Sequence, residues 1–133
     1  MSESENVEIL KGAYAAFSRG DISGLLQMYA LDAEQDIPAV KDLPWAGSQH
    51  GRAEISRFFD TIAQAEEVLD FRQNEFIAQR DRVAVLGTYR ARVKSTGRVW
   101  ETPFVHAVTI RDGKMQKFEL YFDTNAAAEA YRK

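Results

Sequence analysis

The sequence predicts an α+β fold in which N-terminal helices precede an antiparallel sheet. Apolar residues recur at helical spacing near the N-terminus, whereas residues 82–125 hold three runs rich in Val, Ile, Thr, Tyr and Phe. Two turn dipeptides, Thr96-Gly97 and Asp112-Gly113, separate these runs. Helices followed by a meander indicate α+β rather than βαβ winding. We expect residues 1–133 to form a single domain, without a linker or an internal repeat.

The elements before the meander are predicted in order. A first amphipathic helix covers residues 6–19 and ends at Gly20, and Asp21 is placed to cap a short second helix. A brief strand over 33–37 stops at a proline, and residues 38–50 form an irregular loop.

The remaining elements follow this loop. A third helix begins after Gly51 and closes at Glu66-Glu67, and a strand over 68–79 leads into the meander. The alanine-rich segment 124–132 is expected to add a last helical turn or two.

The strand registers follow from the two turns. A two-residue turn at Thr96-Gly97 pairs Gly87 with His106, which leaves space for a ligand opposite the histidine. A three-residue loop over 111–113 pairs His106 with Phe118.

With these registers, one face of the sheet is apolar and His106 is its lone ionisable residue. The reverse face is mixed, with Leu86, Val105 and Ala107 among charged residues. The apolar face carries Val83, Val85, Gly87, Tyr89, Ala91, Val93, Trp100, Thr102, Phe104, His106, Val108, Ile110, Phe118, Leu120 and Phe122.

Composition excludes several partners and chemistries. The net charge is −3 and no basic block occurs, which argues against nucleic acid as a partner. No apolar run approaches the length of a membrane span, and the polar, acidic N-terminus lacks a signal peptide, so a cytoplasmic protein is expected. The absence of cysteine excludes thiolate chemistry, and two histidines far apart in the chain do not predict a metal site.

Several segments together resemble the nuclear transport factor 2-like superfamily, especially its SnoaL-like and ketosteroid-isomerase-like branch. They are AYAAFSRGD, the strand after LDAEQDIP, WAGSQHGRAEISRFF and VHAVTIRDGKMQKFELYFDT, which span nearly the whole chain. The resemblance implies a cone-shaped α+β barrel: a curved antiparallel sheet wraps around the N-terminal helices and encloses a blind apolar pocket. It also implies a homodimer through the outer sheet face.

The family's catalytic residues do not carry over. Ketosteroid isomerase uses an Asp base and an oxyanion hole of a Tyr and a protonated Asp. The resemblance places the base at Ile37, the Tyr at Ala13 and the second Asp at His106. The acid–base Asp of the SnoaL-like cyclases falls near Leu120. Each of these positions holds a different residue here.

Three residues are candidates for catalysis. A buried His106 would stay neutral and could hydrogen-bond a substrate carbonyl, although it could equally be a core histidine with a protein partner. Asp36 could act as a base if a bulge turned it inward, whereas simple alternation puts it on the outer face. The hydroxyl of Tyr14 could reach the cavity, or the ring could simply pack in the core. The expected ligand-binding wall consists of Phe17, Trp45, Phe59, Tyr89, Trp100, Phe104, Phe118, Leu120 and Phe122.

Three functions are compatible with this sequence. The first is a cofactor-independent isomerase, cyclase or hydratase acting on a small apolar carbonyl or polyketide-like compound. The second is a non-catalytic protein that binds a small hydrophobic ligand. The third is an interaction protein that uses its outer sheet face, and a cavity large enough for a ligand would count against it.

Overall fold

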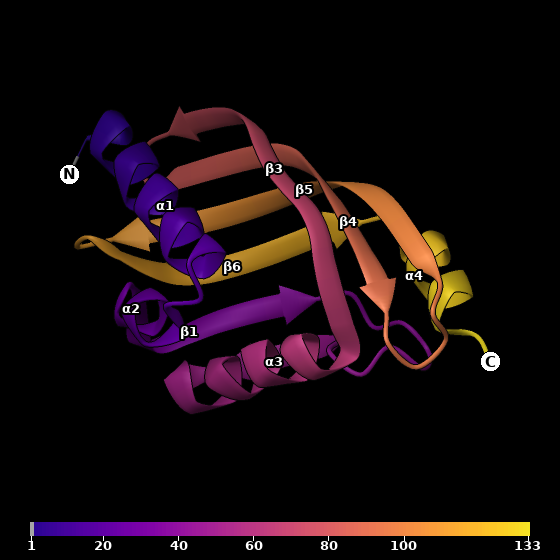
Figure 1. Ribbon diagram of the computed structural model, residues 1–133. Helices are drawn as coiled ribbons and strands as arrows, with labels where there is room; N and C mark the ends of the chain where they lie inside the picture. Colours follow the sequence, from indigo (N-terminus) through magenta and orange to yellow (C-terminus); the bar gives the residue numbers. More distant parts are fainter. Residues whose placement is uncertain (1) are drawn as a thin grey trace.

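The computed structural model describes residues 2–133 and confirms the α+β prediction (Figure 1). Four helices and a six-stranded sheet make up this part of the chain. In chain order the elements are α1 (Glu3–Ser18), α2 (Ile22–Gln27), β1 (Tyr29–Ile37), β2 (Gly47–His50), α3 (Gly51–Ala65), β3 (Glu66–Gln79), β4 (Arg82–Val93), β5 (Val99–Arg111), β6 (Lys114–Phe122) and α4 (Thr124–Tyr131).

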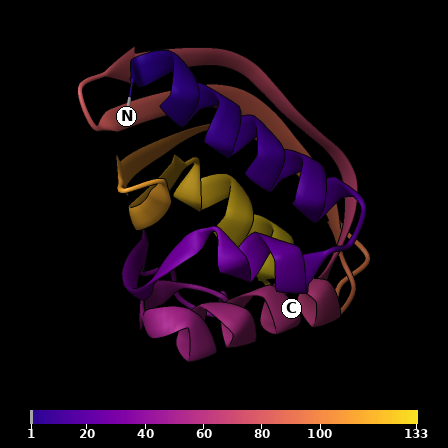
Figure 2. The same cartoon turned by 90° about the vertical axis from the view of Figure 1, so that its left-hand side faces the viewer.

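The sheet is strongly curved but does not close into a complete barrel (Figure 2). Its strand order is β2-β1-β6-β5-β4-β3, so β2 and β3 are the two edges of the described sheet. Helices α1 and α3 lie against the concave side, and α4 packs beside the far end of the strands (Figures 1 and 2). The sheet is mixed rather than purely antiparallel, because β1 runs parallel to β6.

The helix ends follow from local capping. Helix α1 begins three residues earlier than predicted because Ser2 and Glu5 form a reciprocal capping box that satisfies free backbone N–H groups. Asp21 caps α2 as expected, accepting a hydrogen bond of 2.8 Å from the backbone N–H of Gly24. Glu66 has extended backbone angles, so the Glu66-Glu67 pair begins β3 instead of closing α3.

Both predicted hairpin registers are wrong by two residues. The Val93 N–H donates to the Arg98 carbonyl oxygen just before β5, which leaves a four-residue loop over 94–97. Val85, not Gly87, therefore pairs with His106. Asp112-Gly113 is a two-residue turn with positive φ at both positions, and a bulge near Thr109 and Ile110 absorbs the difference. His106 therefore pairs with Leu120. An even shift keeps every side chain on its predicted face.

Gly87 does not open space for a ligand, contrary to the prediction. It pairs with Phe104, and a Cβ at this position would overlap the Arg72 carbonyl oxygen and the Phe104 ring. Glycine is therefore required here by the close approach of β3 and of an aromatic ring.

Residues 29–50 contain more strand than predicted. Strand β1 begins at Tyr29, and β2 lies at the end of the segment expected to be irregular, paired with β1. Gln35 and Ile37 are buried on the concave side, whereas Asp36 between them is partly exposed. None of the helices in residues 2–133 combines the length and apolar character needed to cross a membrane.

Candidate functional site

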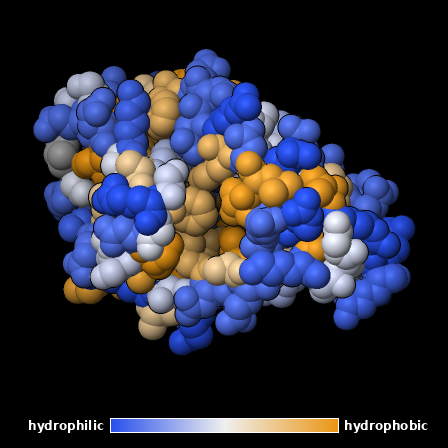
Figure 3. Space-filling model, viewed as in Figure 1, coloured by the Kyte–Doolittle hydropathy of each residue, from blue (hydrophilic) through white to orange (hydrophobic). Residues whose placement is uncertain are grey.

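A cavity of about 120 Å³ lies between the helices and the concave face of the sheet. Figure 3 shows apolar side chains between α1 and α3 and beside them, within a largely hydrophilic surface. The wall is almost entirely apolar and aromatic. It consists of Leu10, Ala13, Tyr14, Phe17, Leu25, Tyr29, Gln35, Ile37, Trp45, Phe58, Phe59, Ile62, Phe71, Tyr89, Trp100, Thr102, Phe104, His106, Met115, Phe118, Leu120 and Phe122.

Every residue that the sequence predicted for the wall lines this cavity, as do His106 and Tyr14. The prediction needed only the correct face of each strand and helix, which the register error did not change. Sequence analysis missed several other lining residues, among them Tyr29, Gln35, Phe71 and Met115. The four positions to which the resemblance assigned catalytic groups, Ala13, Ile37, His106 and Leu120, also line the cavity.

His106 and Tyr14 form a buried hydrogen bond across the cavity wall. The Tyr14 hydroxyl on α1 lies 2.8 Å from Nδ1 of His106 on β5, and both side chains are more than nine-tenths buried. The Phe104 and Phe118 rings lie 4.3 and 4.6 Å from the imidazole, between ring centroids. Burial in this apolar environment lowers the pKa of His106 to about 3 and raises the pKa of the Tyr14 hydroxyl, so both groups are uncharged at neutral pH.

This hydrogen bond uses one ring nitrogen of His106 and leaves the other free for a ligand. The Nε2 atom bonds to no group in residues 2–133. When Tyr14 donates to Nδ1, the proton of the neutral ring is on Nε2, which can then donate to an acceptor in the cavity. In the opposite tautomer Nε2 is an acceptor. The pair can therefore polarise a carbonyl oxygen or accept a proton without a charged resting state.

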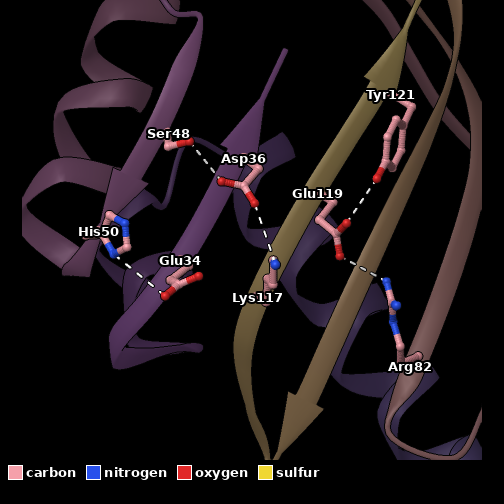
Figure 4. A network of polar contacts seen from close by, with 8 residues as sticks. All are labelled: Glu34, Asp36, Ser48, His50, Arg82, Lys117, Glu119 and Tyr121. Carbon is pink, nitrogen blue, oxygen red and sulfur yellow. Dashed lines mark hydrogen bonds and ion pairs between the residues drawn. The ribbon is translucent and has the colours of Figure 1, made fainter. Parts of the chain in front are cut away.

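Asp36 lies on the outer face of the sheet, so it is not positioned as the pocket base (Figure 4). Its carboxylate accepts a hydrogen bond of 2.9 Å from the Ser48 hydroxyl and lies 3.7 Å from Lys117 Nζ. Regular alternation along β1 turns Gln35 inward instead. The Gln35 amide is held by Tyr29 and Gln49 through two hydrogen bonds of 3.0 Å.

A second buried polar group, Glu66, lies behind the cavity wall and is bonded to two residues that line it, Trp45 and Tyr89. Sequence analysis missed it. The Glu66 carboxylate is 3% exposed and accepts hydrogen bonds from Trp45 Nε1 at 3.1 Å, from the Tyr89 hydroxyl at 2.5 Å and from the Tyr131 hydroxyl. These donors come from the 38–50 segment, β4 and α4. No apolar pattern in the sequence marks Glu66 as inward-facing, since it follows the end of a helix directly.

The other histidine lies on the surface, with His50 Nδ1 3.8 Å from Glu34 (Figure 4). Within residues 2–133, no cluster of three or more His, Cys, Asp and Glu side chains is arranged to hold a metal ion.

Solved structures with the same fold cover almost the whole chain. An NTF2-like protein from Burkholderia xenovorans LB400 is 39% identical with a TM-score of 0.91, covering 99% of each chain. TerC, solved in co-crystals with polyporic acid, is 32% identical with a TM-score of 0.84, covering 97% of this chain and 99% of TerC. A relative found by sequence, an uncharacterized protein from Mycobacterium tuberculosis strain H37Rv, is 26% identical over 98% of both chains.

The fold and the aromatic cavity thus define an NTF2-like protein, as the sequence predicted. The model of the SnoaL-like domain matches residues 10–118, which is most of the chain. The protein belongs to the SnoaL-like domain family.

Proposed function

We propose that this protein is a cofactor-independent isomerase or cyclase that acts on a small aromatic or polyketide-like carbonyl compound. The observation that supports the proposal is the buried Tyr14–His106 hydrogen bond, which leaves Nε2 of a neutral imidazole free on the wall of an aromatic cavity. Tyr14 is the positioning residue, and His106 is the residue that contacts the substrate.

The neutral imidazole suits an electrophilic role. With Tyr14 donating to Nδ1, Nε2–H donates to a substrate carbonyl oxygen. As the C–H bond beside that carbonyl breaks, negative charge grows on the oxygen and the hydrogen bond to Nε2 strengthens. The apolar surroundings make this interaction stronger than it would be in water. Water takes the proton from the carbon. In an isomerisation, the enolate takes this proton back at another carbon. In a cyclisation, the enolate carbon bonds to the carbon of a second carbonyl, the π electrons of that carbonyl move to its oxygen, and the oxygen takes up the proton.

The substrate class follows from the proton-transfer groups of the wall. Among the cavity residues in the described part of the chain, His106 is the side chain whose unperturbed pKa lies nearest to neutrality. Because His106 acts here as the hydrogen-bond donor, the substrate must give up its proton to water. A compound whose C–H group is flanked by two carbonyls is already acidic and needs little help from a protein base. We therefore favour 1,3-dicarbonyl compounds with an aromatic end, which the ring-lined wall would accommodate.

The test is exchange of the acidic C–H of an aryl 1,3-diketone with solvent deuterium, followed by NMR. We expect the protein to accelerate exchange over buffer, and His106→Ala to lower the rate at least tenfold. His50→Ala is the matched control, because it removes the exposed histidine and should leave the rate unchanged. Equal rates for wild type and His106→Ala, with both proteins folded, would contradict the assignment.

Ligand binding without turnover is the second candidate. It is favoured by the apolar wall and by the outward orientation of Asp36. In this case affinity depends on Trp45, Tyr89 and Phe104, and no bound compound is converted.

Polyporic acid is the first probe, because TerC was co-crystallized with it. A thermal-shift titration of wild type and Phe104→Ala should show stabilisation by the probe that weakens in the variant. The cavity counts against a pure interaction protein.

We also expect a homodimer through the outer sheet face. Tyr121 and Val99 are large apolar residues on this face, with exposed fractions of 53% and 42%. Ion pairs such as Arg82–Glu119 cross the same face (Figure 4). Sedimentation velocity of wild type and Val105→Glu tests this, with a dimer expected for wild type and a monomer for the variant. A monomeric wild type would contradict it.

A further inference from the structure

The two indole rings of the cavity wall differ in one respect. Trp45 and Trp100 stack with ring centroids 6.3 Å apart, and each is 5% exposed. Trp45 Nε1 donates to Glu66 and, at 2.9 Å, to the Tyr131 hydroxyl. Trp100 Nε1 is fully buried and has no acceptor in residues 2–133. Because buried donors in folded proteins almost always have a partner, this N–H is a candidate ligand contact.

Trp100 and His106 lie on the same face of β5 and both line the cavity. They are six positions apart on the strand, or roughly 20 Å at about 3.3 Å per residue. Aromatic contacts fill the interval: the centroid distances are 6.1 Å from His106 to Phe71, 5.8 Å from Phe71 to Tyr89 and 5.7 Å from Tyr89 to Trp100. The wall therefore carries a polar group at Trp100 and another at His106, with aromatic rings and the Thr102 side chain between them.

We propose that Trp100 Nε1–H is a second hydrogen-bond donor for the ligand. The cavity then selects elongated, flat aromatic compounds that carry a neutral acceptor oxygen at each end, one for His106 Nε2 and one for Trp100 Nε1. This inference rests on the proposed function for the His106 end, but it concerns binding and does not require turnover.

The chemistry of the Trp100 end specifies the acceptor. An indole N–H can only donate, so the ligand must supply a lone pair. Glu66, the nearby carboxylate, already receives three donors and does not line the cavity. A carbonyl oxygen fits better than a carboxylate, because a single neutral donor would not compensate for burying a charge.

Two matched ligands and one substitution test the proposal. The ligands are a biphenyl with an acetyl group at each end and a biphenyl with one acetyl group, and the protein variant is Trp100→Phe. By calorimetry, wild type should bind the two-acetyl compound about fivefold more tightly than the one-acetyl compound, the effect of one neutral hydrogen bond. In Trp100→Phe the ratio should fall to about one. An unchanged ratio, or no binding of either compound by wild type, would overturn the proposal.

The wild-type protein alone offers a second test, which does not depend on the variant folding. Its two tryptophans give two indole N–H signals in a ¹H–¹⁵N NMR spectrum. The two-acetyl ligand should shift the Trp100 signal and move the Trp45 signal little, because Trp45 Nε1 already has acceptors. A shift confined to Trp45 would overturn the proposal. If the binding ratio and the Trp100 shift appear but no deuterium exchange is found, the proposed catalysis fails and this inference stands.

Discussion

His106 on the cavity wall and Glu66 behind it show different ways of burying a polar side chain. His106 is a neutral imidazole with a single partner, Tyr14. Glu66 receives three donors from distant parts of the chain. A buried carboxylate is tolerated only with several charge-assisted hydrogen bonds, whereas a neutral ring needs fewer. Glu66 therefore has its hydrogen-bond partners within the protein, whereas His106 keeps one ring nitrogen free for a ligand.

Removing the Glu66 carboxylate should have the largest effect on stability. Glu66→Ala leaves the Tyr89 and Tyr131 hydroxyls without their acceptor, and we expect the free energy of unfolding to fall by about 3 kcal/mol. Urea denaturation measures the change. Glu67→Ala is the neighbouring control: its exposed ion pair with Arg92 should contribute less than about 1 kcal/mol. Equal losses for the two variants would show that the Glu66 network is not stabilising.

The burial of His106 should instead make the free energy of unfolding depend on pH. The unfolded histidine takes up a proton below about pH 6.5. The folded one stays neutral until its pKa of about 3. Between these values the unfolded state binds more protons, so stability falls as pH falls, by about 1.4 kcal/mol per pH unit.

Urea denaturation of wild type and His106→Gln at pH 6.5 and 5.0 isolates this effect. Wild type should lose about 1.6 kcal/mol more than the variant over this interval, because the unfolded histidine is already half protonated at pH 6.5. Parallel losses would mean that His106 is protonated in the folded protein.

The partner of His106 should matter less than Glu66. Tyr14→Phe keeps the ring but leaves Nδ1 of His106 without its hydrogen bond, which should cost about 1.5 kcal/mol. Tyr121→Phe removes a hydroxyl bonded to Glu119 on the exposed outer face and should change stability little. Thermal denaturation of the two variants provides the comparison. A smaller loss for Tyr14→Phe than for Tyr121→Phe would argue against a stabilising role for the Tyr14–His106 pair.

The smallest effect is expected for Asp36. Asp36→Asn weakens an exposed contact with Lys117 and should change stability by less than about 0.5 kcal/mol. Because the side chain lies outside the cavity, probe affinity and deuterium exchange should also be unchanged. A large loss of either would mean that Asp36 reaches the ligand after all.

The sequence predicted the fold and the cavity wall because both depend on which face a residue occupies. Alternation places Phe104, His106 and Leu120 on one face in any register that differs by an even number of residues. The registers themselves were missed, since loop length and the bulge near Thr109 are set by backbone geometry that turn dipeptides do not specify. Alternation also decided the fate of two catalytic candidates: His106 faces the cavity, and Asp36 faces outward.

The polar partners could not be predicted from local pattern. Tyr14 lies 92 residues before His106, and Tyr131 lies 65 residues after Glu66. Such pairings depend on how the helices pack against the sheet, and the periodicity of apolar residues does not indicate which distant residues come into contact. The unpaired nitrogen of Trp100 is likewise a property of the packed structure.

The hydrogen bond between Trp45 and Tyr131 also bears on how the molecule assembles during synthesis. The two residues are 86 positions apart, so Trp45 leaves the ribosome long before its hydroxyl partner exists. A nascent chain halted before α4 therefore lacks the Tyr131 hydroxyl that bonds to Trp45, a residue of the cavity wall, and to Glu66. Contacts of such long sequence separation form slowly. We therefore expect ligand affinity to be acquired late in folding, as α4 docks, rather than with the sheet.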